Sequence, residues 1–106
     1  MAKYMFRTSY TQSGLTGLIA EGGTGRREAL RQTVESVGGT LEGFYYAFGD
    51  DDLILITDLP DSTAATTLSL NIAAAGALTV SVTVLIDPAT VDAAVAQGVS
   101  YRLPGA

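Results

Sequence analysis

The sequence predicts an α+β domain in which helices cover one face of a single sheet. Segments with two-residue periodicity alternate with helical segments in the order β-α-β-β-α-β-α. Glycine, proline or aspartate marks most of the boundaries between segments. The chain has 106 residues, which suits one two-layer core. We therefore expect a single domain over residues 1–106.

Residues 3–10 are expected to form a strand, because aromatic residues recur on one parity while Met5 and Arg7 occupy the other. Thr11 suits the N-cap of a short helix. The glycine pair at 22–23 should end that helix, since glycine adopts the left-handed conformation of helix ends. Thr24 or Gly25 is the expected start of a second helix.

That second helix should bury an apolar stripe, and the remaining segments follow from similar signals. The stripe residues are Leu30, Val34 and Val37. The segments expected next are strands over 40–48 and 53–59, a helix from Asp61 to about Ala75, a strand over 78–86, a helix from Asp87-Pro88 to about Gln97, and an extended tail over 98–106.

When the two helical pieces between the first two strands are counted as one interrupted helix, the first six segments form the ferredoxin-like βαββαβ arrangement with right-handed crossovers, and one helix is added at the C-terminus. Its four-stranded antiparallel sheet has helices on one face only. Apolar residues nevertheless occupy both parities, as where Met5 precedes Phe6 and Tyr45 precedes Tyr46. A large exposed apolar patch marks an interface. We therefore expect a dimer at minimum.

Composition excludes several functions. The net charge is −5 with six basic residues, which disfavours nucleic acid and anionic membranes as partners. The chain has no cysteine and no histidine, so disulfides, thiolate metal sites and the commonest general base are missing. No apolar run resembles a signal peptide or approaches the ~20 residues of a membrane span. We expect a cytoplasmic protein without a cofactor or metal.

Three stretches carry a resemblance to a known family, namely KYMFRTSYTQSGLTGLIAEGGTGRREAL, GGTLEGFYYAFGDDDLILITDLPD and SYRLPGA. They resemble the GYD-domain family, and the resemblance covers essentially the whole chain. It implies the dimeric α/β barrel, in which two ferredoxin-like sheets pack together, sometimes within larger rings. Relatives usually have Gly-x-Tyr-Asp at the hairpin, where this chain has Gly-Asp-Asp-Asp at 49–52. Because Asp51 stands at the tyrosine position, no role of that phenol can be carried over.

Arg7 is the first candidate ligand-binding residue. If its parity faces a partner sheet, Arg7 is a cation inside the barrel and needs a partner. Asp58 and Glu42 are the candidates within the subunit, and an acidic ligand between the sheets is the alternative. Some tyrosines could line the same cavity or simply pack at an interface. These are Tyr10, Tyr45 and Tyr46.

Arg26 is the second candidate, in the stretch AEGGTGRREAL at 20–30. The stretch matches neither a Walker loop nor a Rossmann fingerprint, so an ordinary helix break is the plain alternative. A cation at a helix N-terminus opposes the helix dipole, and free glycine amides there attract anions. Arg26 therefore needs a carboxylate, either from Asp52 or from a ligand. We expect the aspartates at 50–52 to be solvated turn residues rather than a metal site.

The leading functional expectation is an oligomeric α/β-barrel protein, a homodimer or larger ring, that binds a small acidic or aromatic ligand between its sheets. One alternative is a cofactor-independent isomerase or monooxygenase, by fold analogy alone. Another is a structural assembly subunit that uses the alanine-rich helix and the tail as contact surfaces. The tail is expected to dock through Tyr101 on its own or a neighbouring subunit.

Overall fold

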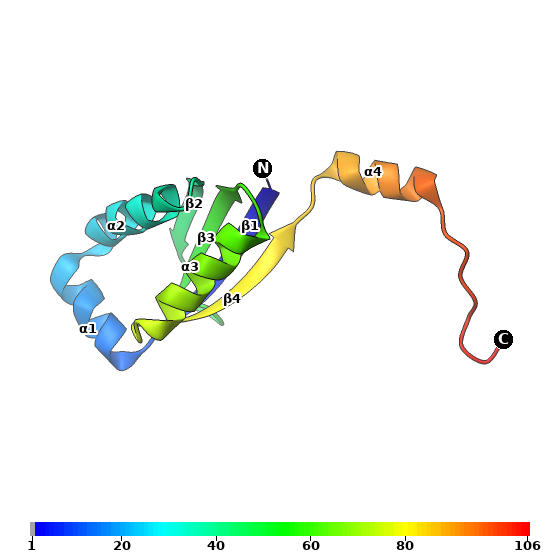
Figure 1. Cartoon of the computed structure of the whole chain (residues 1–106). Helices are drawn as coiled ribbons and strands as arrows, with labels where there is room; N and C mark the ends of the chain where they lie inside the picture. The colour runs from blue at the N-terminus through cyan, green and yellow to red at the C-terminus, as the bar shows by residue number, and fades with distance from the viewer. Residues whose placement is uncertain (1) are drawn as a thin grey trace.

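The computed structural model describes residues 2–106 and has the order β-α-α-β-β-α-β-α, which is consistent with the expected order except that two separate helices lie between the first two strands. The strands are β1 (Ala2–Tyr10), β2 (Thr40–Tyr46), β3 (Leu53–Leu59) and β4 (Leu78–Leu85). The helices are α1 (Gln12–Glu21), α2 (Gly23–Ser36), α3 (Ser62–Ala74) and α4 (Pro88–Gln97) (Figure 1). Strands β2 and β4 end slightly earlier than the sequence predicts.

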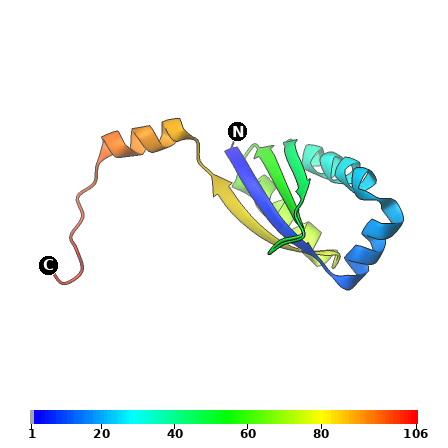
Figure 2. The same cartoon turned by 180° about the vertical axis from the view of Figure 1, so that it is seen from behind.

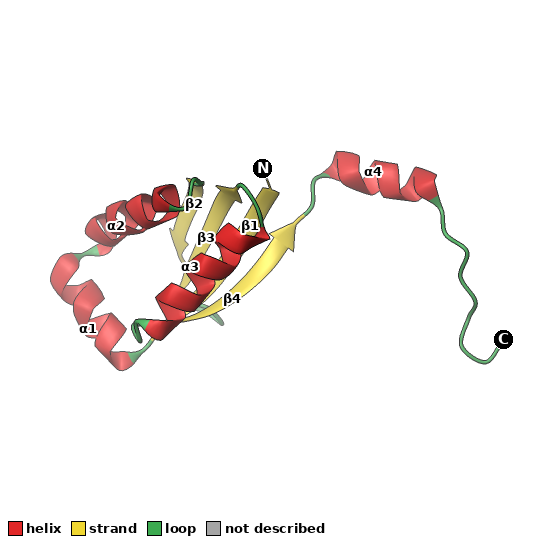
Figure 3. Ribbon diagram, viewed as in Figure 1, coloured by secondary structure: helices red, strands yellow, loops and turns green. Residues whose placement is uncertain are grey.

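The four strands form one antiparallel sheet in the order β2-β3-β1-β4. Helices α2 and α3 lie on the same side of it (Figure 3). The view from behind shows the strands with no helix in front of them (Figure 2). The architecture is therefore α+β, consistent with the ferredoxin-like arrangement, and we call the uncovered side of the sheet the bare face.

The core lies between the sheet and the two helices α2 and α3. Strand residues with even numbers on β1 and odd numbers on β3 are buried there, and Phe6, Leu53 and Leu59 are at most 1% exposed. From the helices, Leu30 and Val34 of the expected stripe and the small residues at the start of α3 complete the core. Alternation in the strands therefore fixes which residues reach the bare face.

Three of the helix caps follow the sequence prediction. The side chains of Thr11, Asp61 and Asp87 accept hydrogen bonds from backbone amides in the first turns of α1, α3 and α4. The cap of α2 differs, because α2 begins at Gly23 and Gly22 is its N-cap. Gly22, at φ 88°, also ends α1 by donating its N–H to Leu18. One glycine serves both helices, which leaves Thr24 and Gly25 inside α2.

Helix α4 and the tail extend away from the rest of the molecule (Figure 1). Helix α4 has no buried residue. The tail over residues 98–106 contains no helix or strand and ends in a turn at Pro104 and Gly105, so only its first part is extended as expected, and Tyr101 is 65% exposed. Tyr101 therefore does not dock on its own subunit. Within residues 2–106, no helix has the length and apolar character needed to cross a membrane.

Candidate functional site

The structure does not bring the five candidate ligand-binding residues together. Arg7 alternates with the buried Phe6 and Thr8, so it lies on the bare face. Tyr45 joins it there, since both residues are paired with Ile54 of β3. The other three candidates, Tyr10, Tyr46 and Arg26, lie on the helix side. A single cavity shared by Arg7 and all three tyrosines is therefore not formed within one subunit.

The centre of the bare face is apolar. Met5 of β1 is paired with Ile56 of β3 on one side and with Thr83 of β4 on the other. Ile54 continues this strip along β3, between Arg7 and Tyr45. All three apolar side chains are half-buried in the single subunit.

The cations of the bare face are already paired. Lys3 Nζ lies 2.7 Å from Glu42 Oε2 and 3.1 Å from Asp58 Oδ2, and hydrogen bonds to these carboxylates, Glu42 first, raise the pKa of Lys3. Glu42 and Asp58 were the expected partners of Arg7, and that expectation is wrong. Strand register explains it, because Asp58 is directly opposite Lys3, while Arg7 lies four residues, or about 13 Å, further along β1.

Arg7 pairs instead with the hairpin between β2 and β3. Its Nε donates to Asp51 Oδ2 over 2.7 Å. The next residue, Asp52, accepts a hydrogen bond from the Tyr10 amide at 2.9 Å and donates its own amide to Thr8. Two of the three hairpin aspartates thus fasten the hairpin to β1, which corrects the expectation of solvated turn residues. No cluster of potential metal ligands occurs among residues 2–106.

Arg26 does not pair with Asp52, because the Asp52 carboxylate accepts a hydrogen bond from the Tyr10 amide instead. Its Nη1 lies 3.5 Å from Glu21 Oε1, just across the glycine pair. The arginine side chain is 27% exposed and borders a cavity of about 240 Å³ between α2 and α3. The half-buried cation thus finds its carboxylate at the end of α1. Because that contact is long and partly exposed, it contributes little to stability.

Two tyrosine hydroxyls meet under the start of α2. Tyr46 Oη donates to the Gly23 carbonyl at 3.2 Å. Burial, followed by the neighbouring Tyr10 hydroxyl, raises the pKa of Tyr46 to about 12. The Tyr10 hydroxyl is itself buried, and no atom of residues 2–106 meets the geometry of a hydrogen bond to it. Tyr46 therefore stays protonated near neutral pH and acts as a hydrogen-bond donor.

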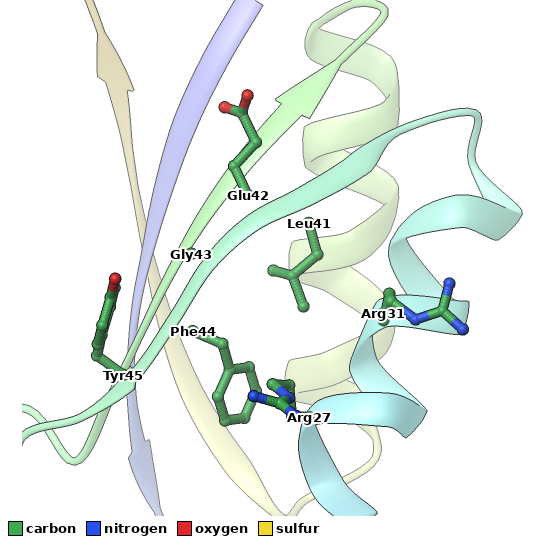
Figure 4. Close-up of a pocket in the computed structure, with 7 residues that line it drawn as sticks. All are labelled: Arg27, Arg31, Leu41, Glu42, Gly43, Phe44 and Tyr45. Carbon is green, nitrogen blue, oxygen red and sulfur yellow. The ribbon is translucent and has the colours of Figure 1, made fainter. Parts of the chain in front are cut away.

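A further groove, which the sequence did not predict, runs between α2 and the edge strand β2 (Figure 4). Its volume is about 290 Å³, and its lining residues are Arg27, Arg31, Leu41, Glu42, Gly43, Phe44 and Tyr45. Glu28 and Glu35 both pair with Arg31. Arg27 forms no ion pair within the described part of the chain and lies beside Phe44 in Figure 4. The sequence feature that could have indicated this groove is the i, i+4 spacing of Arg27 and Arg31, which places the two side chains on neighbouring positions of one helix face.

The one-sided sheet and its bare face define a class of small α+β proteins with an unpaired apolar sheet surface. Within that class, the model of the GYD domain matches residues 4–95, so the chain belongs to the GYD domain family. The resemblance seen in the sequence is thereby confirmed. The match runs from β1 into α4. No curated protein and no solved structure matches the chain.

Proposed function

We propose that this protein is a self-assembling subunit whose bare face packs against the bare face of a second copy, with a small aromatic ligand held between the sheets. The observation that carries the proposal is the composition of that face. An apolar strip of Met5, Ile54 and Ile56 crosses its centre, and its charges are paired within the subunit. Two such faces can be stacked about 10 Å apart, as in sheet packings generally.

Paired charges matter because an uncompensated charge at an interface is costly to bury. Lys3 and Arg7 keep their carboxylate partners when the face is covered. The face holds these two cations against three carboxylates, those of Glu42, Asp51 and Asp58. An acidic ligand would therefore meet an excess of negative charge, which favours the aromatic class over the acidic one.

A row of side chains across three strands supports an aromatic rather than an acidic ligand. Tyr45, Ile54 and Arg7 are cross-strand neighbours on β2, β3 and β1. Tyr45 is 68% exposed, so its ring is free to stack on a ligand. The Arg7 guanidinium at the other end of the row can lie against an aromatic face as a cation–π partner. The expected ligand is thus flat, aromatic and without an acidic group.

The catalytic alternative, a cofactor-independent isomerase or monooxygenase, receives no comparable support. General base catalysis near neutral pH needs a group whose pKa lies near the working pH. The pKa of Tyr46 is raised to about 12, chiefly by burial, which moves this phenol away from such a role. A purely structural subunit would use the same bare face and would differ only in retaining no ligand.

Sedimentation velocity at low micromolar concentration tests the self-association. We expect a dimer or larger assembly for the natural sequence, and a folded but smaller species for Ile56→Asp, because this variant loses the bare-face contact. The matched control is Ile19→Asp on α1, because Ile19 is 84% exposed on the helix side, and it should leave the assembly unchanged. A stable monomer of the natural sequence would overturn the proposal. Native mass spectrometry of protein from its own host would detect a retained ligand.

A further inference from the structure

Helix α4 lacks the packing that a helix of its length needs. It has ten residues, and none is buried. Isolated helices of this length are marginal in water, and most helices are stabilised by packing of an apolar face. Val91 and Val95 lie one turn apart, and they are 52% and 78% exposed. The capping Asp87 and the first-turn Pro88 define where α4 starts, but they cover neither valine.

A second unpaired apolar surface lies on the helix side of the sheet, between α3 and the edge strand β4. This α3–β4 groove has a volume of about 300 Å³, and its lining residues are Tyr4, Ser62, Ala65, Thr66, Ser69, Leu70 and Val82. Leu70 is 65% exposed and Val82 is 36% exposed. Small residues of α3 such as Ala65 and Ser69 leave room for another helix to approach. The groove and the α4 stripe are thus two apolar surfaces without a partner.

Charge favours contact between these two surfaces. The lining of the α3–β4 groove contains no charged residue. The one charged residue of α4 is Asp92, which lies about 100° around the helix from Val91 and about 60° from Val95, so it flanks the valine stripe rather than lying within it. Because each copy has a net charge of −5, two copies repel least where both surfaces are neutral. The groove beside β2 fits less well, since valines there would cover Arg27 and Glu42.

The connection between β4 and α4 determines which copy supplies the helix. Only Ile86 and Asp87 connect them. Asp87 is extended, at φ −77° and ψ 160°, and its carboxylate caps α4 through Thr90. Helix α4 therefore continues outward from β4 and away from its own α3 (Figures 1 and 2). A short hinge that holds an element away from its own body favours exchange of that element between copies.

We propose that α4 of one copy docks in the α3–β4 groove of a second copy, through Val91 and Val95, and that the exchange is reciprocal. This contact uses the helix side of the sheet and does not depend on the bare-face contact. Combined with that contact, it gives each subunit two different self-complementary surfaces, which is how assemblies larger than dimers are built.

Cross-linking between single-cysteine variants tests the exchange, because the natural chain has no cysteine. Val91→Cys and Leu70→Cys chains are mixed in equal amounts and treated with a short bis-maleimide. We expect a cross-linked pair that contains one chain of each kind. The matched control replaces the first variant with Ala93→Cys, which lies on the opposite side of α4. The control should give a several-fold lower yield.

Three outcomes would overturn the proposal. The first is an equal yield from Val91→Cys and Ala93→Cys. The second is cross-linking within one chain of the Val91→Cys/Leu70→Cys double variant, which would show that α4 folds back on its own groove. The third is dominant linkage of Val91→Cys to itself, which would show that two α4 helices pair. Repeating the mixture in the Ile56→Asp background separates this contact from the bare-face contact, and the yield should persist there.

Discussion

The hairpin aspartates show how the position in the fold gives identical residues different roles. Asp50 is exposed, whereas Asp51 binds Arg7 and Asp52 accepts from the Tyr10 amide. The sequence predicts a turn for all three residues, because aspartate is common in turns. It does not predict their partners, since these depend on how β1 aligns with β3. Asp51 therefore has a partner of its own.

Asp52 should be the aspartate that matters most for stability. Asp52→Ala removes a charge-assisted hydrogen bond to the Tyr10 amide, and such bonds contribute about 1.5–3 kcal/mol. Asp50→Ala is the matched control in the same hairpin, and an exposed substitution of this kind changes stability by about 0.5 kcal/mol or less. Urea unfolding of the two variants checks the difference. Equal losses would show that the Asp52 hydrogen bond contributes little.

Tyr46 should make the protein less stable at alkaline pH. An unfolded tyrosine ionises near pH 10, while burial raises the pKa of the folded Tyr46 to about 12. Between these values the unfolded state loses a proton that the folded state keeps, so the free energy of unfolding falls as pH rises from about 10 to about 12. Denaturant melts across this range should show a smaller fall for Tyr46→Phe. Tyr45→Phe, at an exposed position, should behave like the natural sequence.

At the scale of elements, the sequence was sufficient to predict a helix start wherever one residue caps one helix. Thr11, Asp61 and Asp87 cap their helices as the sequence predicts. The start of α2 was missed because Gly22 has two roles, as C-cap of α1 and N-cap of α2. A sequence pattern gives each helix its own cap and does not show that two helices share one residue.

The shared glycine should be sensitive to substitution. Gly22→Ala forces a side chain into a backbone conformation at φ 88° and ψ 160° that is essentially restricted to glycine, and such conformations cost about 1–3 kcal/mol for other residues. Gly17→Ala, inside α1 with open space around the new methyl group, should instead stabilise the protein by about 0.5–1 kcal/mol. Thermal unfolding of both variants checks the opposite signs. A neutral Gly22→Ala would mean that the α1–α2 junction can relax.

At the scale of the whole molecule, the sequence shows which residues of one strand share a side of the sheet. It is less informative about which residues of different strands share that side. Arg7 and Tyr10 lie on opposite parities of β1, so alternation alone separates them. Tyr46 is harder to place, because the register of β2 against β3 shifts between Leu41 and Gly43. Such an irregularity is set by pairing with the neighbouring strand and leaves no local pattern. The fold was therefore more predictable than the grouping of candidate residues.

The tail supplies the last prediction, because the rest of the described part of its own subunit leaves its apolar side chains exposed. Val99, Tyr101 and Leu103 are between 65% and 89% exposed, and within residues 2–106 the Arg102 side chain donates only to the Ala106 carbonyl. We predict that these apolar residues dock on a neighbouring subunit. Deleting residues 99–106 should then lower the thermal midpoint by an amount that grows with protein concentration, since a contact between copies stabilises the folded state by mass action. Thermal melts of the natural and shortened chains, each at a low and a high concentration, measure this difference. A difference that does not change with concentration would place the contact within one subunit, and no difference at all would show that the tail does not dock.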